Sequence, residues 1–529
     1  MLDTIFEGAT IVDGSGRPSY CTDVALVGQR IALIGDLSQR DARIRRSCAG
    51  KVLAPGFIDV HSHSDELWLA LPRCDGKIAQ GVTSEVAGNC GTSVAPLRGV
   101  SLERKRKDAA RYRLELSWTS FDEFFSLVEH QGVGLNVASL VGLGTTRGIV
   151  AGHSELPLEQ GELAAQANLV RSACEQGALG VSSGLIYPPS QYADTQELVA
   201  MARAAKEAHS PLYASHVRSE GDELIDAIAE AIAVGTQAEV AVQCSHHKAQ
   251  RKKNWGKVHQ TLAMIARARE GGLPINTDAY PYVASWTELA SVLPDDARLG
   301  GPTATLARLS DPPTATAIAL KLAMRDPHEW EDVLITSVAS EQNERLAGMR
   351  LSQIAAYWGI TPQHATIRLL REEQLEVEAV FFTMCEDDVS AVFSADFTCV
   401  GSDASVRALQ GITAVGVPHP RTFGTFPRVF GRFVRGRKTL ELEEAVRRMT
   451  SLPAQIFGLR DRGNIRLGSY ADIVVFDAQS VRDLATYEHP YQLPVGIDQV
   501  YVNGTAVFED GQFTGALPGQ VLRRGASTS

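Results

Sequence analysis

The chain has 529 residues, more than one simple core normally contains, so two or more structural units are expected. Hydrophobic residues make up 44% of the sequence and charged residues 21%, which is ordinary for a globular protein. The formal net charge of −11 argues against non-specific nucleic-acid binding, because such binding needs a basic surface.

The beginning of the sequence, MLDTIFEGATIVDGSGRP, lacks the basic region and apolar core of a signal peptide. No stretch approaches the roughly 18 apolar residues that would span a membrane. The eight cysteines are scattered without close pairs, which is typical of free thiols in a reducing compartment. We therefore expect a cytoplasmic protein with neither a membrane nor a nucleic-acid partner. Nothing in the sequence indicates an oligomeric state.

The two ends of the chain resemble each other in pattern. Residues 1–55 contain short alternating segments broken by Gly and Asp, which favours β-hairpins. Residues 461–529 contain similar segments and the turn signal VNG. We predict a small β-sandwich domain built from both ends, with the final five residues, GASTS, disordered.

The middle of the chain, residues 56–460, alternates short apolar runs with amphipathic helical stretches. This rhythm favours a parallel sheet, and we predict a distorted (β/α)8 barrel. From about 289 to 345 the rhythm lapses, which we interpret as an insertion near the barrel mouth. The alternative is an irregular helix pair within the barrel.

Several of the predicted strands end in an ionisable residue, and in such barrels the active site lies at the carboxyl ends of the strands. The first case is the stretch PGFIDVHSHSDE. His61 and His63 are two residues apart, so on a strand they share one face, as two ligands of one metal cluster would. Read alone, such a pair is more often two ordinary loop histidines.

Two further histidines close strand-like runs. His216 ends PLYASH and His246 ends AEVAVQCSH. Strand alternation places Lys248 on the same face as His246, whereas His247 points to the opposite face and is expected to be structural.

A cysteine and an aspartate complete the set. Cys90 lies in EVAGNCGTSVAP, and a thiolate with imidazoles is a good zinc ligand set; the alternative is a buried free cysteine. Asp403 ends FTCVGSD and could take a proton from an attacking water; the alternative is a helix N-cap. The convergence of these strand ends predicts a metal site.

The sequence resembles the amidohydrolase superfamily and, within it, the N-acyl-D-amino-acid deacylases, also called D-aminoacylases. The resemblance covers essentially the whole chain. The motifs that carry it are PGFIDVHSH, GNCG, SHVRSEGDEL, SHHKAQ with NWGK following, DAYPYVASWTEL, GSD, HPRTFGTFPRVFG, MTSLPAQIFGLRDRGNIRLGSYADIVVFD and TGALPGQVLRRG.

The resemblance implies zinc-dependent hydrolysis of the amide bond of N-acyl-D-amino acids. It implies that Cys90, His216 and His246 hold a tightly bound zinc, that His61 and His63 mark a second, weaker position, and that Asp403 is the catalytic base. The preference for D over L substrates comes from the resemblance alone.

The substrate, a small N-acyl amino acid, carries a carboxylate beside the scissile amide. Arg421 offers a bidentate fork for it. Lys248, Tyr280 and Tyr187 are the other contacts that the resemblance implies. The alternatives are surface charges for Arg421 and Lys248 and core aromatics for the two tyrosines.

Two other function classes compete with this reading. One is a related hydrolase that acts on cyclic ureides or dipeptides, but hydantoinases and dihydroorotases bridge their metals with a carboxylated lysine, and ALGVSSGLIYPP contains no lysine. The other is a non-enzymatic scaffold that has lost its metal ligands. Two departures from the family pattern, Leu143 and Asp296, are expected near the substrate and bear on acyl or side-chain preference.

Overall fold

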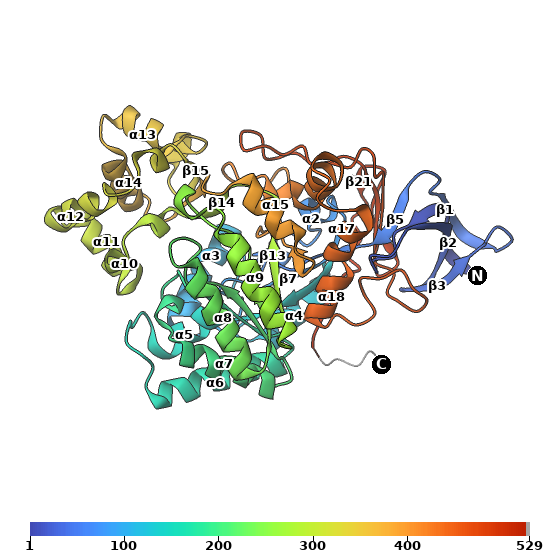
Figure 1. The fold of residues 1–529 in the computed structure, drawn as a ribbon, viewed down its shortest axis with the longest axis horizontal. Helices are drawn as coiled ribbons and strands as arrows, with labels where there is room; N and C mark the ends of the chain where they lie inside the picture. The colour runs from blue at the N-terminus through green and yellow to red at the C-terminus, as the bar shows by residue number, and fades with distance from the viewer. Residues whose placement is uncertain (525–529) are drawn as a thin grey trace.

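The computed structural model describes residues 1–524, which form a parallel barrel surrounded by helices, a β-sheet unit made from both chain ends, and a third, mostly helical unit (Figure 1). The predicted disorder of GASTS lies outside the described residues. In Figure 1 the sheet of the chain ends lies at the right and the helical unit at the upper left, with the barrel between them.

The barrel is made from a six-stranded and a three-stranded parallel sheet. Only Leu140 separates β8 from β9, so these two act as one interrupted strand and, within residues 1–524, the barrel has eight. The strands are β6 (Phe57–Asp59), β7 (Val82–Ala87), β8 (Asn136–Ser139) with β9 (Val141–Gly142), β10 (Val181–Gly184), β11 (Leu212–His216), β12 (Ala241–Cys244), β13 (Ile275–Ala279) and β17 (Thr398–Val400).

The barrel closes where its first strand meets its last. The contact between β6 and β17 is reduced to a single parallel bridge, Ser62 to Ala404, just beyond the two strands. The amide of Asp403 donates to the carbonyl of His61 at 2.8 Å beside this bridge. The backbone ladder at this seam is therefore short, and side chains must help to hold it.

Helices cover the outside of the barrel, as expected for parallel strands buried on both faces. The longer ones are α4 (Phe121–Gln131), α6 (Gln160–Glu175), α7 (Thr195–Glu207), α8 (Leu224–Ala238) and α9 (Lys257–Glu270). Their ends follow from local sequence: Asp194 caps α7 by accepting the amide of Glu197 at 2.8 Å.

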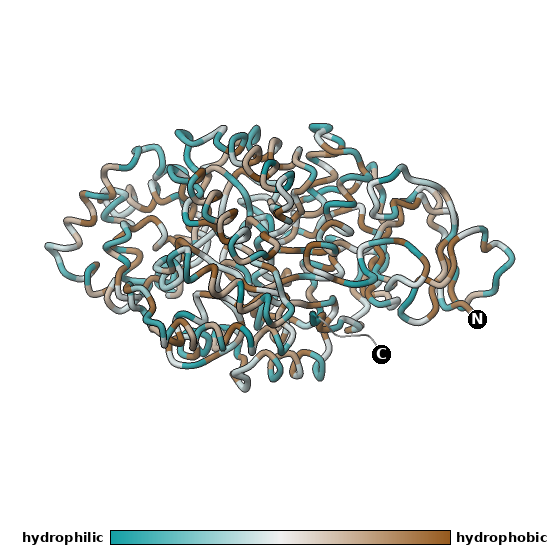
Figure 2. Tube along the Cα trace, turned by 60° about the horizontal axis from the view of Figure 1, so that its bottom comes forward, coloured by the Kyte–Doolittle hydropathy of each residue, from teal (hydrophilic) through white to brown (hydrophobic). Residues whose placement is uncertain are grey.

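The apolar segments lie mainly inside the molecule (Figure 2). None of the helices in the described residues is both long and apolar enough to cross a lipid bilayer.

The helix α18 (Ser451–Phe457) closes one end of the barrel. Leu452 and Phe457 belong to the same buried cluster as the inward-facing Ile58 and Leu212. A pocket beside α18 is also lined by residues that immediately precede strands β11 and β13. The plugged end is therefore the one where the strands begin, which leaves the carboxyl ends open for a site.

Both chain ends contribute to one nine-stranded sheet, in the order β21-β20-β19-β18-β5-β1-β2-β3, with β4 paired to β1. Its strands are β1 (Leu2–Ile11), β2 (Tyr20–Val27), β3 (Arg30–Gly35), β4 (Ala42–Ser47), β5 (Val52–Pro55), β18 (Ile473–Phe476), β19 (Ile497–Val502), β20 (Thr505–Glu509) and β21 (Gln512–Phe513). The predicted VNG turn is confirmed: Asn503 and Gly504, both with positive φ, connect β19 to β20.

The third unit runs from β14 (Ser285–Glu288) to β16 (Val377–Phe381) and has its own hydrophobic cluster. Its three strands pair antiparallel in the order β14-β16-β15, with β15 at Val333–Val338. The packed unit extends beyond the predicted stretch of 289–345, because β16 follows two further helices. Its helices are α10 (Asp295–Arg298), α11 (Gly301–Ser310), α12 (Pro312–Leu322), α13 (Leu351–Trp358) and α14 (Pro362–Glu372).

Glu373, just beyond α14, is 1% exposed and accepts hydrogen bonds from the amides of Ala339 and Ser340 and from the side chain of Asn343. Burial acts to raise the pKa of its carboxyl, but these hydrogen bonds outweigh burial and lower the pKa. The Glu373 carboxylate therefore stabilises the folded unit above the unfolded pKa of about 4.3, and this contribution is lost as the pH falls through the folded pKa.

Replacing Glu373 by glutamine should therefore destabilise this unit by about 1–3 kcal/mol at neutral pH. The difference from the wild type should shrink on acidification below about pH 4. Thermal unfolding at several pH values measures both. A destabilisation that did not change with pH would contradict the assignment to the charged carboxylate.

Candidate metal centre

Three of the predicted site residues lie in left-handed backbone two or three residues beyond the ends of barrel strands. Cys90 has φ of 52°, His246 of 36° and Asp403 of 52°. Such values are uncommon for residues other than glycine and concentrate at functional sites. They turn the chain sharply at the open end of the barrel. Strand alternation, from which His246 and Lys248 were predicted to share a face, does not extend to them because β12 ends at Cys244.

Four buried side chains, each just beyond a different strand, meet at this end. His61, Cys90, His246 and Asp403 each offer a ligand atom, and these atoms all lie within 4.8 Å of one another. Cys90 Sγ lies 3.3 Å from His61 Nε2 and 3.5 Å from His246 Nε2. His61 and Asp403, 342 positions apart in the chain, are thereby brought to one point.

His216, the third residue of the predicted tight site, lies beside this cluster. Its ring centre is 4.4 Å from that of His246. The side chain is buried, yet neither of its ring nitrogens has a hydrogen-bond partner in the structure. A buried imidazole with both nitrogens unsatisfied is costly unless one of them binds something else, such as a metal ion.

Asp403 contacts the predicted residues of both the metal site and the substrate site. Its Oδ1 lies 2.9 Å from His63 Nε2 and 3.5 Å from His61 Nε2, and its Oδ2 lies 3.0 Å from Arg421 Nη1. Burial acts to raise the pKa of this carboxyl, but Arg421 and His61 outweigh burial and hold the pKa well below its usual value. Asp403 is therefore a carboxylate at neutral pH.

The electrostatics of the cluster favour a thiolate. Burial acts to raise the pKa of the Cys90 thiol, but His61 and His246 outweigh it and lower the pKa well below its usual value. Burial acts to lower the pKa of His63, but the hydrogen bond to Asp403 outweighs it, and the pKa rises to about 9. These shifts favour a Cys90 thiolate and a protonated His63 within a buried cluster.

Two carboxylates that sequence reasoning did not assign orient the histidine rings. Asp278 Oδ1 lies 3.1 Å from His61 Nδ1, and Glu220 Oε1 lies 2.8 Å from His246 Nδ1. In each ring this leaves Nε2 directed at Cys90. Carboxylates in this position are typical of metal-binding histidines. A signal for Glu220 was available, since it follows His216 by four residues in SHVRSEGDEL.

Lys248 is buried and bonded within the protein. Its ammonium donates to Glu220 and to the carbonyl of His246 at 2.9 Å, and it lies 2.7 Å from His246 Nδ1. Glu220 also accepts from Gln250 at 2.6 Å. The Lys248 ammonium therefore already has two acceptors in the protein. His247 points elsewhere, with Nε2 2.9 Å from Thr261 Oγ1.

The predicted aromatic contacts flank the centre. The Tyr187 ring packs edge-on against His216 at 5.2 Å between centroids, and its hydroxyl lies 2.9 Å from Thr287 Oγ1. The Tyr280 ring lies beneath the Arg421 guanidinium at 4.7 Å. Tyr187 thus contacts His216, and Tyr280 packs against Arg421, which pairs with Asp403.

The two departures from the family pattern lie in different places. Leu143 begins α5 (Leu143–Ala151) and is 2% exposed in the barrel core. Asp296 lies on α10 of the third unit, where its exposed carboxylate pairs with Lys321. Asp296 is therefore neutralised by a neighbour within its own unit.

The donor set fits a zinc ion. One thiolate, several imidazoles and one carboxylate are the ligands that zinc prefers, and the unsatisfied nitrogens of His216 complete the set. The structure thus brings together Cys90, His216, His246, His61 and His63 with Asp403 and Arg421.

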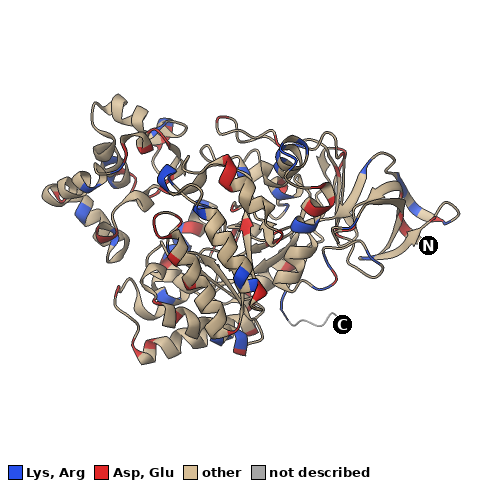
Figure 3. Ribbon diagram, viewed as in Figure 1, with Lys and Arg blue, Asp and Glu red and all other residues tan. Residues whose placement is uncertain are grey.

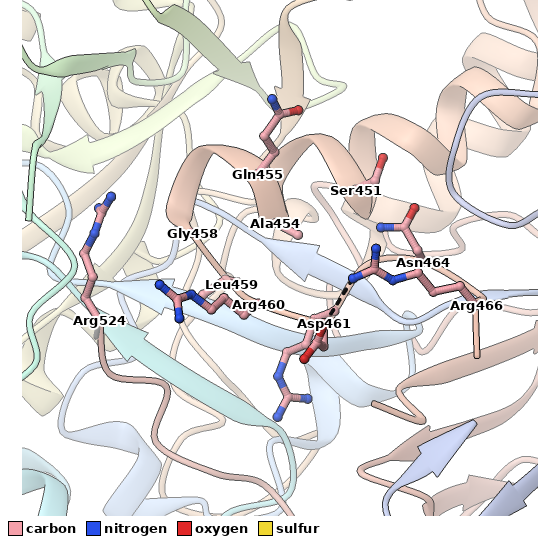
Figure 4. Close-up of a pocket in the computed structure, with 11 residues that line it drawn as sticks. Ser451, Ala454, Gln455, Gly458, Leu459, Arg460, Asp461, Asn464, Arg466 and Arg524 are labelled. Atoms are coloured by element: carbon pink, nitrogen blue, oxygen red, sulfur yellow. Dashed lines mark hydrogen bonds and ion pairs between the residues drawn. The ribbon is translucent and has the colours of Figure 1, made fainter. Parts of the chain in front are cut away.

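A pocket of about 450 Å³ lies beside α18, at the plugged end of the barrel (Figure 4). It is lined by Ser451, Ala454, Gln455, Gly458, Leu459, Arg460, Asp461, Arg462, Asn464, Arg466 and Arg524. Arg466 pairs with Asp461 at 3.1 Å, and Arg462 with Asp472. None of the predicted site residues lines this pocket. Basic and acidic residues are interspersed over the rest of the molecule (Figure 3).

Comparison with known proteins yields full-length relatives. The sequence model described as Amidohydrolase family matches residues 47–508. An N-acyl-D-glutamate deacylase of Alcaligenes xylosoxydans xylosoxydans is 38% identical over 99% of this chain and 97% of the relative. A D-aminoacylase of the same organism is 35% identical over 99% and 98%. The crystal structure of N-acyl-D-glutamate deacylase from Bordetella bronchiseptica, complexed with zinc and a phosphonate mimic of the tetrahedral intermediate, is 36% identical, with 99% of both chains covered and a TM-score of 0.83.

Proposed function

The chain belongs to the amidohydrolase family, and on this premise we propose that it hydrolyses N-acyl-D-amino acids to a carboxylic acid and a free D-amino acid. The observation that carries the proposal is the buried cluster of His61, Cys90, His246 and Asp403 at the open end of the barrel. The D preference rests on the substrates named for the relatives.

The proposed cofactor is zinc, as in the relative from Bordetella bronchiseptica. The tightly bound zinc ion would be held by Cys90, His216 and His246. A second, weaker position would be marked by His61 and His63. Zinc, when bound, lowers the pKa of water from about 15.7 toward about 7 and polarises a carbonyl oxygen. Glu220 and Asp278 keep two of the histidine rings oriented for this purpose.

Asp403 is the proposed general base and acid. Its carboxylate is ionised at neutral pH and faces the same space as the Nε2 atoms of His61 and His63. It would accept a proton from the attacking water and return it to the nitrogen of the leaving amine, so that one group serves both steps.

Arg421 is the proposed contact for the substrate carboxylate. It is 2% exposed, and its Nε and Nη1 have no hydrogen-bond partner in the structure, although Nη1 lies near Asp403. A guanidinium held in place by Tyr280 with free donors suits bidentate binding of a carboxylate. Tyr187 and Lys248 complete the proposed contacts, and Lys248 would share its ammonium between Glu220 and the substrate.

Replacing Arg421 by methionine should raise KM for N-acyl-D-amino acids by at least about tenfold, because a charge-assisted hydrogen-bonded pair contributes about 1.5–3 kcal/mol. Steady-state kinetics with each acylated amino acid and its carboxamide test this. The loss should be selective for the free carboxylate. An equal loss for acids and amides would reject the carboxylate contact and assign Arg421 to Asp403 alone.

The proposed function is tested with N-acetyl-D- and N-acetyl-L-amino acids, assayed with the protein before and after zinc loading. Hydantoins and dipeptides serve as the rival substrates. Zinc-dependent release of D-amino acids is expected. Turnover of hydantoins or dipeptides without turnover of acyl amino acids would overturn the proposal.

We place the unit boundaries near residues 55 and 460, supported by the shared sheet of the chain ends. A cytoplasmic location is supported by the eight cysteines, all of them free thiols in the described residues.

A further inference from the structure

We propose that Lys77 is a positioning residue, whose buried ammonium holds the backbone on both sides of Asp403 against the strand that leads to His61 and His63. The inference rests on the proposed function in so far as Asp403 acts as the base. Lys77 lies in none of the motifs that carry the family resemblance.

The contacts of Lys77 are complete and short. The residue lies on the short helix α2 (Asp75–Ile78) with a side chain that is 0% exposed. Its Nζ donates to Asp59 Oδ2 at 2.5 Å, to Ser402 Oγ at 2.7 Å and to the carbonyl of Ala404 at 2.8 Å. An ammonium has three donors, so all of them are used.

These partners flank Asp403 directly. Ser402 and Ala404 are the two chain neighbours of Asp403. The Lys77 ammonium donates to the hydroxyl of Ser402 and to the carbonyl of Ala404. Asp59 accepts the Ser402 amide at 2.9 Å and the Ser402 hydroxyl at 2.6 Å. The backbone of Asp403 is therefore clamped from both sides.

The clamp lies at the seam where the first and last barrel strands meet. Asp403 has the left-handed φ of 52°, which persists only when the surroundings determine it strongly. The backbone seam between β6 and β17 is a single bridge at Ser62 and Ala404. Because Asp59 precedes His61 by two residues, the same ammonium ties the histidine strand to the base. Lys77 thus sets the distance between the base and two of the metal-site histidines.

A second buried carboxylate constrains the choice of variant. Glu85 Oε2 lies 3.5 Å from Lys77 Nζ and accepts from the hydroxyls of Ser62 and Ser64. Removing Lys77 alone would leave two buried carboxylates without a cation, which is strongly destabilising. The test therefore removes the charge of Asp59 together with that of Lys77, while Glu85 keeps the hydrogen bonds that Ser62, Ser64 and Trp68 donate to it.

The experiment compares the double variant Lys77→Met/Asp59→Asn with Arg462→Met/Asp472→Asn. The control also removes a buried ion pair, with exposed side-chain fractions of 3% and 4%, but one that lies beside α18 at the plugged end of the barrel, where Arg462 lines the pocket. Thermal unfolding, zinc content, kcat and KM are measured, together with the absorption spectrum of the cobalt-substituted proteins.

In the Lys77 variant we expect kcat to fall about 10- to 100-fold, the range typical of groups that orient metal ligands, with KM little changed. The cobalt spectrum should change as well. The control should lose thermal stability only. A folded Lys77 variant with the kcat and cobalt spectrum of the control would overturn the proposal.

If the double variant does not fold, Ser402→Ala decides the matter, because it removes one of the clamp contacts without burying a free charge. A kcat lowered several-fold at constant KM supports the clamp, and an unchanged kcat overturns it. Failure of the proposed function is distinguishable: the wild type would then release no D-amino acid, while the cobalt spectra would still report whether Lys77 shapes the centre.

Discussion

Replacement of Asp403 by asparagine is expected to lower kcat by about 10²- to 10⁴-fold, the contribution of general acid–base catalysis. Asparagine has nearly the same shape and can still contact His63 and Arg421, so the cluster should stay assembled. What is lost is the ability to accept a proton from water and to pass it to the leaving amine. KM should change little, because the effect lies in the chemical step.

Zinc analysis accompanies the kinetics, since loss of metal would also lower kcat. Asp483→Asn is the matched control: its carboxylate is similarly shielded and pairs with Arg428 at 2.8 Å, but it is not part of the cluster. The control should retain full activity. An Asp403→Asn protein with its zinc in place and near-normal turnover would show that another group moves the proton.

Replacement of Cys90 by alanine should remove both the zinc and the activity. The Cys90 thiolate is the group that lies between His61 and His246, and without it the tight site keeps only His216 and His246. A metal supplies several kcal/mol of transition-state stabilisation, and about 1.4 kcal/mol corresponds to a tenfold rate change, so we expect a loss of at least about 10³-fold.

Metal content by atomic absorption and activity with added zinc measure this effect. Cys244→Ala is the control, because Cys244 is buried in β12 but burial raises the pKa of its thiol to about 12, so it stays protonated. That variant should keep its zinc. If Cys90→Ala bound zinc and turned over substrate as well as the control, the thiolate would have no part in the centre.

Much of the metal centre could be predicted from strand ends alone. Parallel strands in a barrel deliver their last residues to one end, so His61, Cys90, His216, His246 and Asp403 could be grouped without knowing any distance. The hairpin at Asn503 followed from local conformational preference. The family resemblance added the proposed roles, and relatives at 35% and 38% identity cover 99% of this chain.

The sequence by itself therefore determined the fold class and grouped the residues proposed for the metal centre, because hydrophobic periodicity and the succession of strands along the chain can be read locally. Tertiary structure alone decided which groups support them. Glu220, Asp278 and Lys77 are bonded across loops and across a seam joining residues 59 and 402, and no periodic pattern reports such partners. A buried charge takes whichever opposite charge or dipole packing brings within about 3 Å, and packing depends on the whole fold.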